Sequence, residues 1–377
     1  MESFLSASKT ALSNLSAYKR VRVVMGNETC DLDSAVSTLV QALSEYLDGV
    51  KNKSTDLAVI PIMNIREREY RIKTEVTFFL KLHNITFDML TFRDQIDLTS
   101  LQNNEDTELE LVLVDHHSLP DKDAHLAKSV VKVIDHRPRD ERWPWPGIEV
   151  RIQGVGSCAT LIARDLFDKH PEAIDSQVSS LLRGPIVIDT CNFSKEADRA
   201  TSDDVKIIEQ LEKIDDRSVS DRNQVFNAIV EAKADVSELT ADDLLIRDLK
   251  VTNRVPIAGL PMLVQDFLDL PDSLNSLERF TENGNSTVAV VIGLILFSGT
   301  LSRDIAVFSL TTDPLGEKII EALTTSTQPC LELTLARTIR NESGKYSLHL
   351  YTQGNLRATR KQILPIIRNV VSTECRC

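Results

Sequence analysis

The sequence lacks the features that mark a membrane-spanning or disulfide-stapled protein. No apolar run reaches the roughly 18 residues that cross a bilayer, and the longest candidate, STVAVVIGLILF, predicts a buried strand. The 6 cysteines form no C-x-x-C pair and no zinc-binding spacing, which favours free thiols in a reducing compartment. Basic residues are also few, 43 against 56 acidic ones, and the net charge is −13. This balance disfavours a general nucleic-acid-binding surface, so an anionic substrate would need metal ions or a locally basic pocket.

Length and composition predict two domains and an intracellular location. At 377 residues the chain exceeds one ordinary core. We place the domains at 1–215 and 222–377, with a connection near 213–222, where charged residues surround one predicted helix. Residues 1–20 lack the basic start and apolar block of a secretory signal, which favours the cytoplasm. Their Ser-rich, sparsely acidic composition leaves a mitochondrial presequence as the alternative.

The two halves have different patterns, and both are of the α/β class. The first half has short β-branched runs at RVRVVMG, DLAVIPIM, LELVLVD and VVKVIDH, and a helical pattern in REREYRIKTEVTFFLKLH. This alternation predicts a parallel sheet flanked by helices. The second half begins with helical residues and continues with predicted strands at STVAVVIGLIL, DIAVFSL, CLELTLAR and YSLHLYTQG. With a last helix from about Arg360, it predicts a smaller α/β domain with a mixed or antiparallel sheet.

Acidic and histidine side chains follow three of the predicted strands of the first half. Asp31 and Asp33 follow the first strand, Asp115 follows the third and His136 the fourth. Because the carboxyl ends of parallel strands are about 5 Å apart, these residues could line one crevice. Aspartate-rich ligation with one or two imidazoles suits two Mn²⁺ or Mg²⁺ ions that activate a water. The alternatives are that an aspartate only caps the helix opening at Ser34 and that the histidine only packs or hydrogen-bonds.

Candidate anion-binding groups lie nearby and near the C-terminus. Arg137 follows His136 directly, and a guanidinium is a permanent, bidentate phosphate donor. The glycine-flanked segment GVGSCAT, residues 154–160, could present backbone N–H groups to an anion at a helix start or could serve packing. A basic cluster occurs near the C-terminus, and its alternative is a solvated helix face. The cluster consists of Arg357, Arg360, Lys361 and Arg368.

Several motifs together resemble one known family. GNETCDLDS, LVDHHSLP, VIDHRP, GSCAT and PIVIDT occur in the order seen in the DHH phosphoesterase superfamily, and specifically in its prune and short-chain exopolyphosphatase branch, including animal members. NIREREYRIKTE and FRDQIDL resemble the same branch, while DLLIRDLK and TRKQILP resemble its associated C-terminal domain, which family II inorganic pyrophosphatases share. The resemblance spans nearly the whole chain. It implies two divalent cofactors, Mg²⁺ or Mn²⁺, and an active site in the cleft between two domains.

The resemblance also implies a role for individual residues. Asp31 and Asp33 would each bind one metal, Asp115 would bridge the two, and His136 and Asp189 would complete the ligand set of the second metal. The full set of implied metal ligands is Asn27, Asp31, Asp33, Asp115, His136 and Asp189. The implied catalytic residues are Asp115, His136 and Arg137, and the implied substrate ligands are Arg137, Lys250, Arg360 and Lys361. Asn27 stands where the pyrophosphatases have a histidine, Arg137 replaces a substrate-facing histidine, and His117 occupies a variable position.

These features predict a metal-dependent hydrolase of phosphoanhydride bonds in short-chain polyphosphates, acting through an activated water. One rival within the enzyme class is hydrolysis of a cyclic nucleotide or a very short oligonucleotide. Nucleotide-cleaving relatives commonly carry a G-G-G-H type motif, which this sequence lacks. A rival of another class is a protein-binding scaffold, because prune relatives are linked to partners such as nucleoside diphosphate kinase. We expect no stable nucleic-acid binding and no membrane insertion.

Overall fold

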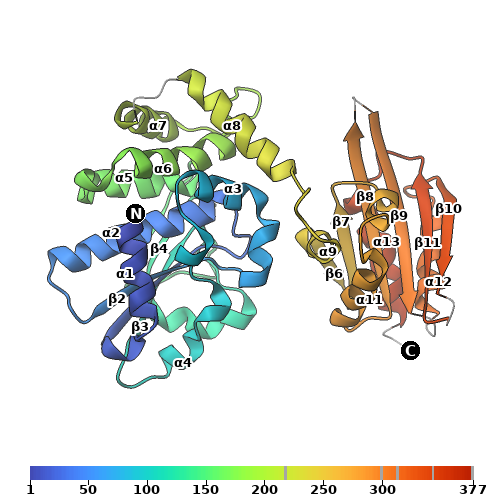
Figure 1. Ribbon diagram of the computed structural model, residues 1–377, viewed down its shortest axis with the longest axis horizontal. Helices are drawn as coiled ribbons and strands as arrows, with labels where there is room; N and C mark the ends of the chain where they lie inside the picture. The colour runs from blue at the N-terminus through green and yellow to red at the C-terminus, as the bar shows by residue number, and fades with distance from the viewer. Residues whose placement is uncertain (216–218, 298–299, 311–313, 342–343, 375–377) are drawn as a thin grey trace. The chain divides into compact units, whose positions relative to one another are not determined.

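The computed structural model describes residues 1–215, 219–297, 300–310, 314–341 and 344–374. The chain divides into unit 1, Met1–Asp235, and unit 2, Val236–Cys377, and each unit has its own sheet (Figure 1). Within the described ranges, no helix has the length and apolar character needed to cross a membrane.

Unit 1 contains a five-stranded parallel sheet in the order β2-β1-β3-β4-β5. The strands are β1 Arg20–Met25, β2 Leu57–Ile62, β3 Glu108–Val114, β4 Val130–Asp135 and β5 Glu149–Ile152. The prediction of a parallel N-terminal sheet is confirmed, and β1 to β4 coincide with the four predicted strands. The prediction missed β5, because this edge strand has only four residues and none of them is fully buried.

Helices cover both faces of this sheet. They are α1 Glu2–Leu12, α2 Leu32–Lys51, α3 Thr74–Leu82, α4 Leu98–Gln102, α5 Cys158–Lys169, α6 Ser176–Asp189, α7 Ser202–Ile214 and α8 Val219–Ala234. One face packs against α2 and α5, and α6 packs against both of these helices (Figure 1). The other face packs against α4 and a 3-10 helix, Asp121–Ser129, while α1 lies against the edge strand β2. The sheet is therefore buried between two apolar layers, as parallel sheets usually are.

The helical pattern predicted over residues 66–83 forms two elements. A 3-10 helix, Glu67–Ile72, precedes α3, and the two are separated at Lys73, whose ψ of 64° is not helical. Both elements bury the apolar side chains that defined the pattern, including Tyr70 and Phe79. The apolar periodicity was therefore a correct guide to the buried face but not to the continuity of the helix.

The division between the units follows α8, whereas the sequence predicts a connection near 213–222. Residues 216–218 of that predicted connection lie outside the described residues. Helix α8 packs against α3 and α6, and the carbonyl of Lys233 accepts a hydrogen bond from the Thr74 hydroxyl at 3.4 Å. These contacts place α8 in unit 1, so the division comes after Asp235.

A buried ionic cluster ties the sheet of unit 1 to α2. The Arg22 guanidinium on β1 lies 2.6 Å from Glu45 Oε2 and 2.6 Å from Glu110 Oε2, and Lys132 Nζ on β4 lies 2.6 Å from Glu45 Oε1. Burial acts to raise the pKa of Glu45, but the charges of Lys132 and Arg22 outweigh this effect and lower the pKa. Glu45 is therefore an ionised group that balances two cations beneath the sheet.

We expect Glu45→Ala to lower the free energy of unfolding by about 1–3 kcal/mol, because it removes the partner that Arg22 and Lys132 share and leaves them only Glu110 and Glu149. Urea denaturation of parent and variant measures this difference. Glu69→Ala is the matched control, since Glu69 is more exposed and its pairing distance to Arg68 is 3.8 Å. Its expected cost is below about 1 kcal/mol. Equal costs for the two substitutions would show that the ionic cluster does not stabilise the sheet.

Unit 2 contains a six-stranded mixed sheet in the order β10-β11-β9-β8-β7-β6, in which only β7 and β8 are parallel. The strands are β6 Leu249–Thr252, β7 Val255–Leu260, β8 Val288–Phe297, β9 Thr300–Leu310, β10 Leu333–Arg340 and β11 Tyr346–Gln353. The predicted mixed sheet is confirmed, and the four predicted strands coincide with β8 to β11. Strands β6 and β7 were missed, since β6 is a polar edge strand and β7 contains Pro256.

Helices also lie on both faces of the unit 2 sheet. They are α9 Ala241–Arg247, α10 Val264–Leu268, α11 Ser273–Asn283, α12 Leu315–Thr325 and α13 Arg360–Glu374. One apolar core joins α9, α10 and α11 to the sheet, and a second joins α12 and α13 to the opposite face (Figure 1). The last helix begins at Arg360, as predicted.

Candidate active site

The candidate site lies where the strand order of unit 1 reverses. From β1 the chain crosses to β2 on one side, and β3 then pairs with β1 on the other side. Such a switch point opens a crevice at the carboxyl ends of the strands. Gly26 follows β1, and a Cβ atom there would lie 2.1 Å from Ser34 Oγ. Only glycine lets the chain turn this closely into α2, and the Asn27 amide then donates to Ser34 Oγ at 2.7 Å.

Asp31 both caps α2 and lines the site. The helix begins at Leu32, earlier than the predicted start at Ser34, and Asp31 Oδ1 accepts from the Ser34 amide at 3.0 Å. Asp31 therefore does cap α2. Its second oxygen accepts a hydrogen bond from Thr29 Oγ1 at 2.9 Å. Because this side chain also lines the cavity described below, capping does not exclude a role in the site.

Asp33 is buried in the first turn of α2 and binds the start of α5. Its carboxylate accepts hydrogen bonds from the backbone amides of Cys158 at 2.6 Å and Ala159 at 2.8 Å. The Ser37 hydroxyl also donates to it, at 3.1 Å. The helix start within the predicted anion-binding segment 154–160 therefore does bind an anion, and that anion is the chain's own Asp33.

Asp115 and His136 meet Asp33 at the carboxyl ends of β3 and β4. Asp115 has a left-handed backbone conformation, with φ of 57°, and its side chain is buried. His136 Nε2 lies 3.3 Å from Asp115 Oδ1 and 3.9 Å from Asp33 Oδ2. His136 Nδ1 lies 3.0 Å from the Val155 carbonyl, so this nitrogen donates there and Nε2 faces the carboxylates. The three residues bring one ligand atom each within 4.8 Å of one another.

One cavity of about 340 Å³ brings most of the predicted unit 1 residues together. It is lined by Asp31, Asp33, Asp115, His136, Arg137, Val155, Gly156, Asp189 and Arg199. Asp189 ends α6, and its Oδ2 atom is buried with no hydrogen-bond partner in the described part of the chain. The sequence had pointed to six of these residues individually, and the cavity shows that they face one space.

The carboxylates of this cavity are electrostatically frustrated. Burial and the charge of Asp33 raise the pKa of Asp115 to about 7. Burial, with the charge of a neighbouring aspartate, also raises the pKa values of Asp33 and Asp189. Burial acts to lower the pKa of His136, but the hydrogen bond to Asp115 and the charge of Asp33 outweigh this effect and raise the pKa to about 9. Oxygen-rich groups that repel one another fit a hard divalent cation, which would offset their charge and satisfy the free oxygen of Asp189.

Asn27 lies beside Asp115, and its amide orientation bears on its predicted role as a ligand. Its Nδ2 donates to Asp115 Oδ2 at 2.5 Å, while its Oδ1 accepts from the Thr29 amide at 2.8 Å. Asn27 does not line the cavity in this orientation. To bind a metal through its oxygen, the amide group would have to turn over. In the observed orientation the side chain instead supports the turn that follows β1, by accepting from the Thr29 amide.

We expect Asn27→His to raise the affinity for Mn²⁺ relative to Mg²⁺, because imidazole nitrogen favours transition metals over Mg²⁺. Paired activation curves with each metal, for parent and variant, measure the change. Asn64→Ala is the control, since Asn64 Nδ2 supports the same turn by donating to the Gly26 carbonyl at 2.8 Å. Superimposable Mn²⁺ to Mg²⁺ ratios for parent and Asn27→His would mean that residue 27 only shapes the turn.

Arg137 and His117 have different environments in the structure. Arg137 Nη1 donates to Asp115 Oδ1 at 2.6 Å and to Asp135 Oδ1 at 3.1 Å, so its guanidinium lies against the carboxylates. The His117 ring instead joins Asp135 to the backbone amide of Asp140, which donates to His117 Nε2 at 2.9 Å. His117 does not line the cavity. His117 therefore holds the loop that follows Arg137 against the end of β4.

The predicted cations of unit 2 lie around one corner of that unit. Arg360 donates to the Asp248 carbonyl at 2.7 Å and to Asp248 Oδ1 at 2.8 Å. A Cβ atom at Gly259 would lie 2.8 Å from Arg360 Nη1, so glycine makes room for this pair. Lys250 and Lys361 are exposed, and their side chains have no hydrogen bond or ion pair with any residue that the structure describes. Two of the three predicted cations, Lys250 and Lys361, thus have no side-chain partner among the described residues.

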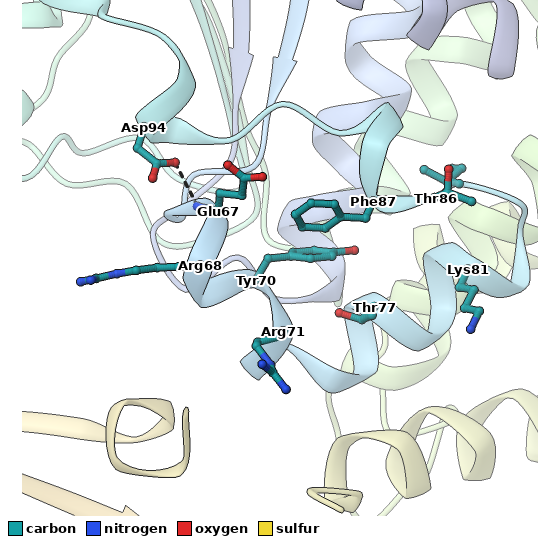
Figure 2. Close-up of a pocket in the computed structure, with 10 residues that line it drawn as sticks. Glu67, Arg68, Tyr70, Arg71, Thr77, Lys81, Thr86, Phe87 and Asp94 are labelled. Carbon is teal, nitrogen blue, oxygen red and sulfur yellow. Dashed lines mark hydrogen bonds between the residues drawn. The ribbon is translucent and has the colours of Figure 1, made fainter. Parts of the chain in front are cut away.

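Unit 1 also contains a larger cavity, of about 730 Å³ (Figure 2). The rings of Tyr70 and Phe87 lie against each other there, with centroids 5.9 Å apart. The backbone amide of Glu67 donates to Asp94 Oδ1 at 2.9 Å, so the Asp94 carboxylate in the wall of this cavity already has a hydrogen-bond partner. This cavity shares no lining residue with the carboxylate cavity, and its aromatic wall lacks the grouped ligand atoms found there. Size therefore does not identify the reactive site in this unit.

Comparison with known proteins agrees with the sequence motifs. A family model described as the DHHA2 domain matches residues 227–370. The protein named exopolyphosphatase PRUNE1 of Homo sapiens is 35% identical over 379 residues, covering 99% of this chain and 80% of the human one. A manganese-dependent inorganic pyrophosphatase of Methanothrix thermoacetophila is 24% identical over 228 residues, covering 60% of this chain and 64% of the relative.

Among solved structures, the crystal structure of a candidate family II inorganic pyrophosphatase of Methanococcus jannaschii is similar, with a TM-score of 0.48 and 19% identity. The match covers 93% of this chain and 99% of that one. The full-length identity to the human relative, rather than this structural match, decides the family. The chain belongs to the prune branch of the DHH phosphoesterase superfamily.

Proposed function

We propose that the chain is a metal-dependent phosphohydrolase that cleaves terminal phosphoanhydride bonds of short-chain polyphosphates. The observation that supports this most strongly is the clustering of four carboxylates, one imidazole and two arginines around a single small cavity. The relatives named exopolyphosphatase and inorganic pyrophosphatase support the same class of reaction. The cavity volume lies at the lower end of the usual range of ligand pockets, about 300–1,000 Å³, which suits a small anion.

In this proposal the chain's own groups hold two divalent cations and the substrate. Asp31, Asp33, Asp115, His136 and Asp189, with Asn27 if its amide turns, would hold Mg²⁺ or Mn²⁺, with Asp115 as the bridge. Bound there, the cations would polarise phosphoryl oxygens and make a water more acidic. Arg137 would donate to the phosphoryl group, since its guanidinium already lies 2.6 Å from Asp115 Oδ1.

We also propose that Lys250, Arg360 and Lys361 neutralise the substrate's remaining charge. The exposed ammonium groups of Lys250 and Lys361 are free to bind an anion, and Arg360 would exchange its contact with Asp248 for a phosphate. The cytoplasmic location and a protein partner such as nucleoside diphosphate kinase remain predictions of the sequence.

A chromatographic assay of products from pyrophosphate, tripolyphosphate, tetrapolyphosphate and cyclic AMP, each with Mg²⁺ and with Mn²⁺, tests the proposal. We expect inorganic phosphate from the linear polyphosphates, no AMP from cyclic AMP, and loss of turnover with excess chelator. Release of AMP without phosphate would instead support the phosphodiesterase alternative. No turnover of any substrate, in a chain that binds metal and is folded, would support the protein-binding alternative.

A further inference from the structure

Arg199 is a cation of the carboxylate cavity that no motif had indicated. It lies in the segment between α6, which ends at Asp189, and α7, which begins at Ser202, and it is one of the residues that line the cavity. The guanidinium is exposed and has no hydrogen bond or ion pair with any side chain or backbone group in the described ranges. Arg137, the other arginine of the cavity, is by contrast held by Asp115 and Asp135.

The backbone at Arg199 is fixed although its side chain is free. Asp204 is fully buried, and its Oδ2 atom accepts hydrogen bonds from the amides of Thr201 at 2.7 Å and Gly156 at 2.8 Å. Gly156 belongs to the cavity wall, and a Cβ atom there would lie 3.2 Å from the Arg199 carbonyl oxygen. Asp204 therefore anchors the segment against the cavity, and Arg199 extends from a defined position.

The charges of the cavity indicate what this free guanidinium meets. Two divalent cations would offset the four carboxylates, and the substrate's own charge would be left for the two arginines of the cavity and the cations proposed in unit 2. Arg137 lies against Asp115 and so is placed for the reacting phosphoryl group. Arg199 has no such partner and is more exposed, so its guanidinium is free to bind a group farther along the substrate. Each additional phosphate of a polyphosphate adds negative charge. A guanidinium can bind such a phosphate through two parallel hydrogen bonds.

We propose that Arg199 binds the phosphate beyond the scissile pair and so favours chains of three or more phosphates over pyrophosphate. This inference rests on the proposed function. It assigns a residue to chain-length preference, which the metal ligands alone do not determine, because they act on the scissile phosphates whatever the chain length.

The kinetic test compares pyrophosphate with tripolyphosphate for the parent, Arg199→Ala and Arg199→Lys. We expect Arg199→Ala to lower kcat/KM for tripolyphosphate by about 10- to 100-fold, the range for a lost charge-assisted hydrogen bond, and that for pyrophosphate by less than about threefold. Arg199→Lys should recover part of the loss, since it keeps the charge but not the bidentate geometry. Lys195→Ala is the matched control, because Lys195 is an exposed cation of the same segment that does not line the cavity.

A binding measurement gives a second readout that does not require turnover. Isothermal titration with imidodiphosphate and diimidotriphosphate, in the presence of Mg²⁺, should show weaker binding of only the three-phosphorus analogue to Arg199→Ala. Equal losses for both analogues, matched by Lys195→Ala, would show general attraction and overturn the assignment, as would no loss at all. If the parent hydrolyses neither substrate, the proposed function fails and this inference with it. An active parent with an unchanged preference in Arg199→Ala overturns this inference alone.

Discussion

Asp115→Asn is expected to reduce phosphate release by at least about a thousandfold while leaving the fold intact. Asp115 is central to the cavity, with Oδ1 lying 2.6 Å from Arg137 Nη1 and 3.3 Å from His136 Nε2. A bridging carboxylate offers two charged oxygens, whereas an amide offers one neutral oxygen. The substitution should therefore weaken cation binding and remove the acidified water on which turnover depends.

The fold should tolerate this change because the site already disfavours the ionised group. Burial and the charge of Asp33 raise the pKa of Asp115 to about 7, so a neutral amide resembles the protonated acid. Thermal unfolding with excess chelator should give similar midpoints for parent and variant. Asp140→Asn is the control for losing a neighbouring carboxylate, since the Asp140 carboxylate pairs with the exposed Arg142. Activity within tenfold of the parent at saturating metal would remove Asp115 from the bridging role.

Replacing Arg360 and Lys361 together by alanine is expected to lower kcat/KM by about 10²- to 10⁴-fold and to leave metal affinity nearly unchanged. Each charge-assisted phosphate contact is worth about 1.5–3 kcal/mol, and cationic side chains do not ligate metal ions. Steady-state kinetics with tripolyphosphate and isothermal titration with Mn²⁺ measure the two quantities separately. Lost metal affinity with unchanged kinetics would contradict this assignment of roles.

The double substitution also removes the Arg360–Asp248 pair, so a structural effect must be distinguished. Asp248→Asn is the matched control, because it weakens the same pair, in which Arg360 Nη2 lies 2.8 Å from Asp248 Oδ1, but keeps both cations. If the cations act on substrate, Asp248→Asn should keep most of the activity. A loss as large as that of the double variant would indicate that the pair matters only for holding α13 against the strand pair β6 and β7.

Most of the strands that the sequence predicted are short runs of buried apolar residues. Strands β1 to β4, β8 and β9 contain buried apolar, β-branched runs that can be recognised locally, whereas β10 is mostly exposed. Helix α6 is different, because its run PIVID contains Pro185 and β-branched residues that favour a strand. It is helical because tertiary packing overrides that preference, with Gly184 placed against the ring of Phe79. Such packing is not visible in the sequence of the segment itself.

The site was partly predictable for a comparable reason. Residues at strand ends of a parallel sheet converge, which identified Asp31, Asp33, Asp115 and His136 without any contact information. Arg199 was not predictable from its neighbours, because it is one cation in a polar segment whose position depends on Asp204. The sequence also did not show that the backbone amides at the start of α5 bind Asp33 of the chain itself and not an external anion, because this contact joins residues far apart in the sequence. Local patterns identify residue types, and the fold decides which of them share a cavity.

Anomalous scattering from crystals grown with Mn²⁺ tests the cation site most directly. We expect two peaks in unit 1, both within the cavity that Asp31, Asp33, Asp115, His136 and Asp189 line. Crystals of Asp115→Asn, grown under the same conditions, should lose at least one of these peaks. A parent crystal at saturating Mn²⁺ with no peak at these carboxylates, or with manganese bound only elsewhere, would contradict a metal-dependent mechanism at this site.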